Sequence, residues 1–102
     1  MFKHTYYISM VSQSEPLLDK LFARDQFEAK AIEYFNGFTR SEAVGEWAGL
    51  PPERTLVYTI ITGEERAMMS EALAAYAAEF FFQDSVLLTT EEIQAKFIKS
   101  RA

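Results

Sequence analysis

Residues 55–61 constrain the fold most, because the run Thr-Leu-Val-Tyr-Thr-Ile-Ile is β-branched and apolar on both of its faces. A short run of this kind is typical of a central strand that helices cover. We therefore expect a sheet with helices packed against it.

Three further segments are predicted to be strands, and the two longer ones have a period-two pattern. Residues 5–11 are rich in aromatic and β-branched types, and residues 85–89 form a second, shorter run. Residues 38–48 alternate as far as a turn at 49–52, and Gly45 within them indicates a bulge or a close backbone approach. One face of the first segment carries Tyr6, Ile8 and Met10.

The first predicted helix begins at Asp25, because Asp25 to Glu28 resembles a capping box. It ends before Asn36-Gly37, a good C-terminal stop. The apolar residues at helical spacing within it are Phe27, Ala31, Tyr34 and Phe35. Ser14, ahead of Pro16, is a candidate N-cap of a short helical turn before this helix.

The second predicted helix follows a capping box at Thr62 to Glu65 and runs to about Phe82. Its apolar stripe consists of Met69, Leu73, Tyr76 and Phe80. Beyond the strand at 85–89, residues 92–98 fit either a fifth strand, with Ile93, Ala95 and Phe97 alternating, or a terminal helix. We favour the strand.

The predicted order is β-α-β-β-α-β, which is that of the ferredoxin-like fold. We therefore expect one α+β domain over residues 1–102, a sandwich in which two helices cover one face of an antiparallel sheet. The chain length suits a single core.

Composition argues against several classes of function. The formal net charge of −5 disfavours nucleic-acid binding, which needs a dense basic face, and no apolar run is long enough to cross a bilayer. The chain has no cysteine and a single histidine, so we expect no thiolate chemistry and no metal or cofactor. Residues 1–7 lack the pattern of a secretory signal, which predicts a cytoplasmic location.

Several short motifs resemble a family of small bacterial ferredoxin-like domains of unknown function. They are Phe35-Asn36-Gly37-Phe38-Thr39, Gly45-Glu46-Trp47 and Asp84-Ser85-Val86-Leu87, set between an early aromatic strand and the run at 55–61. The resemblance covers most of the chain but departs from the family at Asp84 and at Leu17 to Ala23. It implies a fold and a homodimer, and no activity.

The candidate ligand or interface residues are Tyr6, Phe38, Arg40, Trp47 and Tyr58. If the aromatic ones, with Tyr7, line the sheet face opposite the helices, they mark an interface or a ligand groove. The competing interpretation is that they are ordinary core. Arg40 and Arg54 are either anion-binding groups or exposed ion-pair partners. His4 is either solvated or, less simply, catalytic.

Two hypotheses of function follow. In the first, the chain is a binding module that dimerises through its sheet face or an edge strand, buries Trp47 and encloses a small apolar ligand. In the second, it is a small cofactor-free enzyme with a pocket between helices and sheet, lined by His4, Arg40 or Tyr58. The second hypothesis requires an enclosed cavity that holds polar side chains within hydrogen-bonding reach of one another.

Overall fold

The computed structural model describes residues 1–10, 17–46, 48–49, 51–64 and 66–101. The predicted order of elements is confirmed. In chain order they are β1 (Phe2–Ser9), α1 (Leu17–Phe35), β2 (Thr39–Gly45), β3 (Glu53–Thr62), α2 (Ala67–Phe80) and β4 (Leu87–Glu92).

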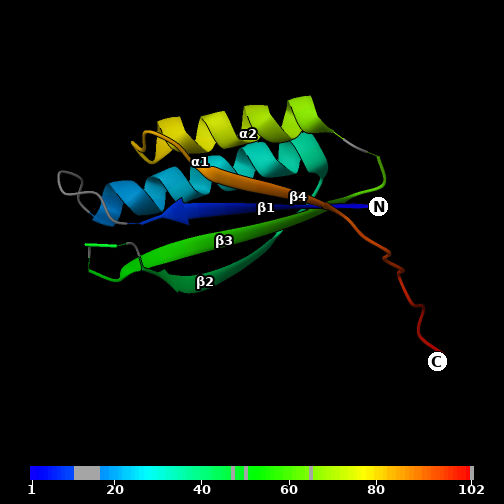
Figure 1. The fold of residues 1–102 in the computed structure, drawn as a ribbon. Coiled ribbons are helices and arrows are strands. Elements are labelled where there is room, and N and C mark those ends of the chain that lie inside the picture. The colour runs from blue at the N-terminus through cyan, green and yellow to red at the C-terminus, as the bar shows by residue number, and fades with distance from the viewer. Residues whose placement is uncertain (11–16, 47, 50, 65, 102) are drawn as a thin grey trace.

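The four strands form one antiparallel sheet in the order β2-β3-β1-β4, and both helices lie side by side on one face of it (Figure 1). The segment at 55–61 lies within β3, which has a neighbour on each side, so its prediction as a central strand is confirmed. β2 and β4 are the edge strands. This small α+β arrangement is consistent with the predicted ferredoxin-like topology.

The core lies between the helices and the sheet. The buried hydrophobic residues of the described part of the chain are Tyr6, Ile8, Met10, Ala23, Phe27, Ala31, Leu56, Tyr58, Ile60, Leu73, Ala77 and Phe81. The ring of Phe27, from α1, packs between two sheet tyrosines, with centroids 5.9 Å from Tyr6 and 4.6 Å from Tyr58. Aromatic pairs at such separations add to the free energy gained by burial.

The first helix begins eight residues earlier than predicted, at Leu17 rather than Asp25. The capping-box interpretation of Asp25 to Glu28 is therefore wrong, because these residues lie inside α1 and Glu28 uses its carboxylate in contacts with other elements. The predicted end is confirmed: Asn36 has φ of 65°, the left-handed conformation that stops a helix.

The second helix begins later than predicted, at Ala67. Thr62 is not its N-cap but the last residue of β3, and its hydroxyl donates to the Glu64 carbonyl over 2.6 Å. Arg66 occupies the N-cap position without a side-chain capping bond. The helix ends at Phe80, two residues before the predicted end. Of the predicted stripe, Leu73 is fully buried and Phe80 packs against the core, whereas Met69 and Tyr76 are only partly buried. The other buried residues of the helix are Ser70 and Ala77.

The predicted strand boundaries are shifted, most of all near the C-terminus. β4 spans Leu87–Glu92 rather than 85–89, and residues 93–101 form neither the strand nor the helix considered for 92–98. The pairing of β2 with β3 continues without a break from Thr39 to Gly45, so the bulge suggested for Gly45 is absent from that ladder. The predicted helical turn at Ser14 lies outside the described residues.

Candidate interaction face

The sheet has one face that no helix covers, which we call the open face. Successive side chains of a strand point to opposite sides, so Tyr6 and Ile8 point to the helices while Thr5 and Tyr7 point away from them. The centre of the open face consists of Thr5, Tyr7, Val57, Thr59, Leu87 and Thr89, which are neighbours in the strand register.

This centre is uncharged and partly apolar. Tyr7 is 39% exposed and Leu87 53%, and the two are paired across β1 and β4. The charged side chains on the open face lie toward its two ends: Lys3 beside Glu91 at one end, and Glu53 at the other. Depletion of charge at the centre of a surface is a mark of protein interfaces.

A pocket of about 330 Å³ opens on this face at the Glu53 end, and we call it the Tyr7 pocket. Tyr7 and Leu87 supply apolar surface, Glu53 supplies a carboxylate, and Thr55 and Ser85 supply hydroxyls. Its volume is at the lower end of the range of ligand pockets, about 300–1,000 Å³. Such a site suits one large side chain or a small apolar molecule.

The predicted site residues lie elsewhere. Tyr6 and Tyr58 are fully buried and point toward the helices, and Phe38 packs on the edge of Tyr58 at 5.4 Å between ring centroids. The interpretation of these three as ordinary core therefore fits their placement, whereas the expectation that they line the face opposite the helices does not. Trp47 lies outside the described residues.

Arg40 joins a polar cluster that also contains Tyr58 and Glu28. The Tyr58 hydroxyl donates to Glu28 Oε2 over 2.7 Å, and the Arg40 guanidinium pairs with the same oxygen. Burial, with the nearby Glu28 carboxylate, raises the pKa of the Tyr58 hydroxyl well above its usual range. The hydrogen bond to Glu28 raises the pKa of Arg40. Arg40 is thus an ion-pair partner that ties β2 to α1.

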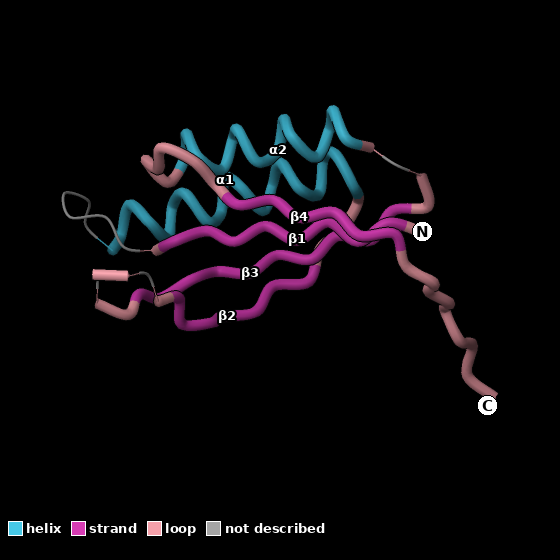
Figure 2. Tube along the Cα trace, in the orientation of Figure 1, coloured by secondary structure: helices cyan, strands magenta, loops and turns pink. Residues whose placement is uncertain are grey.

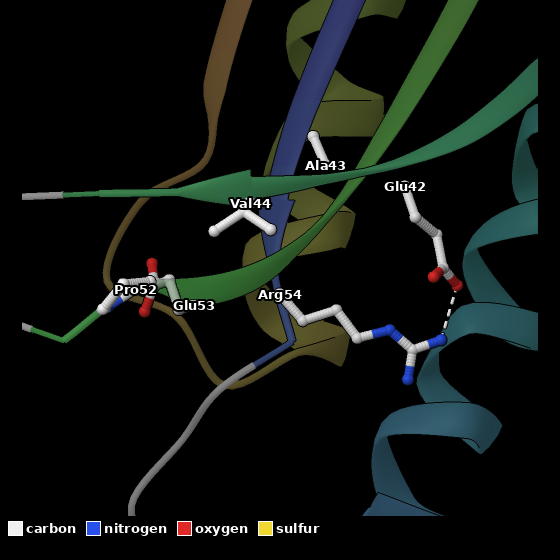
Figure 3. A pocket seen from close by; sticks show the side chains of 6 residues that line it. All are labelled: Glu42, Ala43, Val44, Pro52, Glu53 and Arg54. Atoms are coloured by element: carbon white, nitrogen blue, oxygen red, sulfur yellow. Dashed lines mark hydrogen bonds and ion pairs between the residues drawn. The ribbon is translucent and has the colours of Figure 1, made fainter.

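Arg54 is also an ion-pair partner. It pairs with Glu42 diagonally across β2 and β3, and Figure 3 shows the two side chains pointing toward each other. The hydrogen bond from Arg54 lowers the pKa of the Glu42 carboxyl. Both residues line a pocket of about 390 Å³ at the β2–β3 end of the sheet, together with Val44 and Pro52 (Figure 3).

His4 is buried, so the expectation of a solvated histidine is wrong. Its Nε2 lies 3.0 Å from Thr62 Oγ1, which already donates to the Glu64 carbonyl and therefore accepts from His4. Nδ1 lies 3.0 Å from Thr90 Oγ1 and 3.2 Å from Ser70 Oγ, within hydrogen-bonding distance of both hydroxyls. These hydrogen bonds join β1, β3, β4 and α2.

The Tyr7 pocket, the pocket at the β2–β3 end and a third pocket beside Arg66 to Met69 are not lined by His4, Arg40 or Tyr58. The described part of the chain also contains no group of three His, Cys, Asp or Glu side chains placed to hold a metal ion. No helix among the described residues has the length and apolar character needed to cross a bilayer.

The sequence pattern identified Tyr7 as an aromatic of this region but did not identify Val57, Leu87 or the Tyr7 pocket. Alternation along 55–61 and 85–89 places Val57 and Leu87 on defined sides of their strands. It does not say which side the helices occupy, and that is what decides which residues are exposed.

None of the known family profiles matches the chain, and no curated protein matches it. Among solved structures, the fold is similar to that of a DUF3240 family protein from Shewanella baltica OS155. The TM-score is 0.56, the sequence identity is 14%, and the match covers 97% of each chain. This likeness is one of fold. It agrees with the expectation of a small domain of unknown function, and the motif-level resemblance stays a prediction.

Proposed function

We propose that this chain is a single-domain, ferredoxin-like binding module that forms a homodimer through the open face of its sheet. The observation that carries the proposal is the uncharged centre of that face, where Tyr7, Val57 and Leu87 lie together with no helix over them. An apolar sheet face is normally covered, either within the chain or by a partner.

A second copy is the partner that we favour, because a sheet face packs well on an identical one. Sheets that pack face to face lie about 10 Å apart, and their side chains interdigitate. On the open face, small threonines lie beside the larger Tyr7 and Leu87, so the large side chains of one copy can fit over the small ones of the other. A twofold axis makes each contact twice, so a modest patch contributes double to the dimer. A small apolar ligand in the Tyr7 pocket is compatible with this arrangement.

The test is sedimentation of the wild type and of Tyr7→Glu over a range of concentrations. We expect a wild-type dimer, and a folded monomer for Tyr7→Glu, because two carboxylates would be buried without partners. Met68→Glu is the matched control, since Met68 lies on α2, away from the open face, and is 85% exposed. It should remain a dimer.

A wild type that is monomeric at every concentration would contradict the proposal, as would a Tyr7→Glu dimer as stable as the wild type. Native mass spectrometry of the same samples reports whether a small molecule accompanies the protein. A monomer that carries such a molecule would favour a ligand-binding protein without self-association.

A further inference from the structure

Residues 93–101 form an extended segment, here called the arm, that runs away from the rest of the chain (Figure 2). Two large apolar side chains on it are almost fully exposed, Phe97 at 91% and Ile98 at 83%. The radius of gyration, 14.8 Å, exceeds the value of about 13 Å for a compact domain of this length. Adjacent exposed apolar side chains on a projecting segment indicate a contact surface.

The start of the arm is fixed to the sheet. The Ile93 amide donates to the Met1 carbonyl over 2.7 Å, and the Met1 ammonium donates to the Ile93 carbonyl over 3.2 Å. The arm therefore leaves from the end of the open face where Lys3 and Glu91 lie, the end opposite the Tyr7 pocket.

The arm and the rest of the chain carry opposite charge. Residues 93–102 contain three cations, Lys96, Lys99 and Arg101, and no acidic residue. Because the whole chain has a formal net charge of −5, residues 1–92 carry −8. The arm is thus attracted to a surface of the kind that the rest of another copy presents.

We propose that in the homodimer the arm of each copy crosses to its partner and places Phe97 in the partner's Tyr7 pocket. This inference rests on the proposed function, since it assumes that two open faces meet. The apolar walls of the pocket, Tyr7 and Leu87, receive the ring, and the Glu53 carboxylate at its rim lies near the neighbouring cation Lys96 or Lys99.

The direction of packing follows from charge. Two sheet faces can meet about a twofold axis along the strands, which brings the two cationic arms together, or about an axis across the strands, which brings each arm to the partner's Glu53 end. Repulsion between like charges disfavours the first arrangement. The second places each arm beside a Tyr7 pocket.

The length of the arm and the contact area of the open face both agree with this arrangement. Phe97 lies four residues after Ile93, which is about 13 Å along an extended chain, enough to cross the separation of about 10 Å between packed sheets. Four strands about 4.8 Å apart and about seven residues long give a footprint of about 400 Å². A stable interface buries about 800 Å² per partner. The open face alone is smaller than this, and the arms supply additional contact area.

A cysteine test suits a chain that has no cysteine of its own. Phe97→Cys protein is mixed with isotope-labelled Leu87→Cys protein under mild oxidation, and the disulfides are mapped by mass spectrometry. We expect the 97–87 bridge between chains to exceed, at least tenfold, the bridge formed when Met68→Cys replaces Leu87→Cys. Equal yields, or a predominance of bridges between two copies of position 97, would overturn the proposal.

A second measurement separates this inference from the proposed function. Phe97→Ser should raise the dimer dissociation constant about 100-fold or more, because two buried rings are lost per dimer. Since Phe97 is exposed within one chain, its loss leaves the fold intact. If Tyr7→Glu dissociates the dimer while Phe97→Ser changes its dissociation constant less than about twofold, the arm exchange is wrong and the open-face dimer stands. A wild type that is monomeric would contradict both the arm exchange and the open-face dimer.

Discussion

The Tyr58 hydroxyl donates a hydrogen bond of 2.7 Å to the Glu28 carboxylate, which links the middle of β3 to α1. Arg40 on the edge strand β2 pairs with the same carboxylate, so three elements meet at one oxygen. A hydrogen bond to a charged acceptor is stronger than a neutral one, and here it lies beside the buried Phe27 ring. The cluster holds α1 in place over β3.

This cluster makes stability sensitive to alkaline pH. The pKa of Tyr58 is raised by burial and by the Glu28 carboxylate, and burial raises the pKa of Tyr6 to about 12. The unfolded chain loses these protons near pH 10 while the folded chain keeps them. The free energy of unfolding is therefore unaffected below pH 10 and falls above it, by about 1.4 kcal/mol per pH unit for each such tyrosine.

In Tyr58→Phe, the free energy of unfolding should fall less steeply above pH 10, because the contribution of Tyr58 to the slope is lost. The slope is measured by urea unfolding between pH 8 and 11.5 at a fixed protein concentration. Phe22→Leu is the matched control, because the side chain at position 22 is exposed and carries no ionisable group, so this variant should keep the slope of the wild type. Equal slopes for Tyr58→Phe and the wild type would show that the Tyr58 hydroxyl is not protected from ionisation in the folded chain.

Phe27 is the second position that we expect to dominate stability. Its fully buried ring touches Tyr6 and Tyr58, so Phe27→Ala leaves a cavity between α1 and the sheet. The expected cost is about 3–5 kcal/mol, measured by urea unfolding. Phe22→Ala, on the same helix but at an exposed position, should change stability by less than about 1 kcal/mol. A loss at Phe22 as large as at Phe27 would place the core elsewhere.

The order of elements could be predicted from the sequence because most segments have either a clear period or a clear composition. Residues 55–61 form a short run rich in β-branched residues, as strands are, and Met69, Leu73 and Phe80 recur at helical spacing. The boundaries were less predictable, because polar residues near helix ends have several uses. Glu28 looks like a capping residue, yet its carboxylate accepts a hydrogen bond from Tyr58 and pairs with Arg40, and both partners are distant in sequence.

The candidate site was harder to predict, for a geometric reason. Alternation shows that Tyr6 and Tyr7 point to opposite sides of β1, but both are large and aromatic. Only the position of the helices determines that Tyr6 is core and Tyr7 is exposed. The arm presents a different difficulty: Ile93, Ala95 and Phe97 alternate as in a strand, but in the described structure residues 93–101 have no regular secondary structure. A strand pattern without a neighbour in its own chain is what an exchanged segment would show.

The buried His4 gives the last prediction. His4→Leu keeps much of the ring's volume but removes the partner of the hydroxyls of Ser70, Thr62 and Thr90. Of these, Thr62 keeps its bond to the Glu64 carbonyl and Thr90 is exposed to water, so the cost comes mainly from the buried Ser70 hydroxyl. We expect a loss of about 1–3 kcal/mol in the free energy of unfolding, because a buried hydroxyl left without a partner is expensive. His4→Gln should cost less than His4→Leu, because the amide oxygen of glutamine can accept a hydrogen bond from a neighbouring hydroxyl. Urea unfolding at neutral pH measures the stability of the two variants relative to the wild type. A His4→Leu variant as stable as the wild type would mean that the histidine only fills space and that its hydrogen bonds contribute nothing to stability.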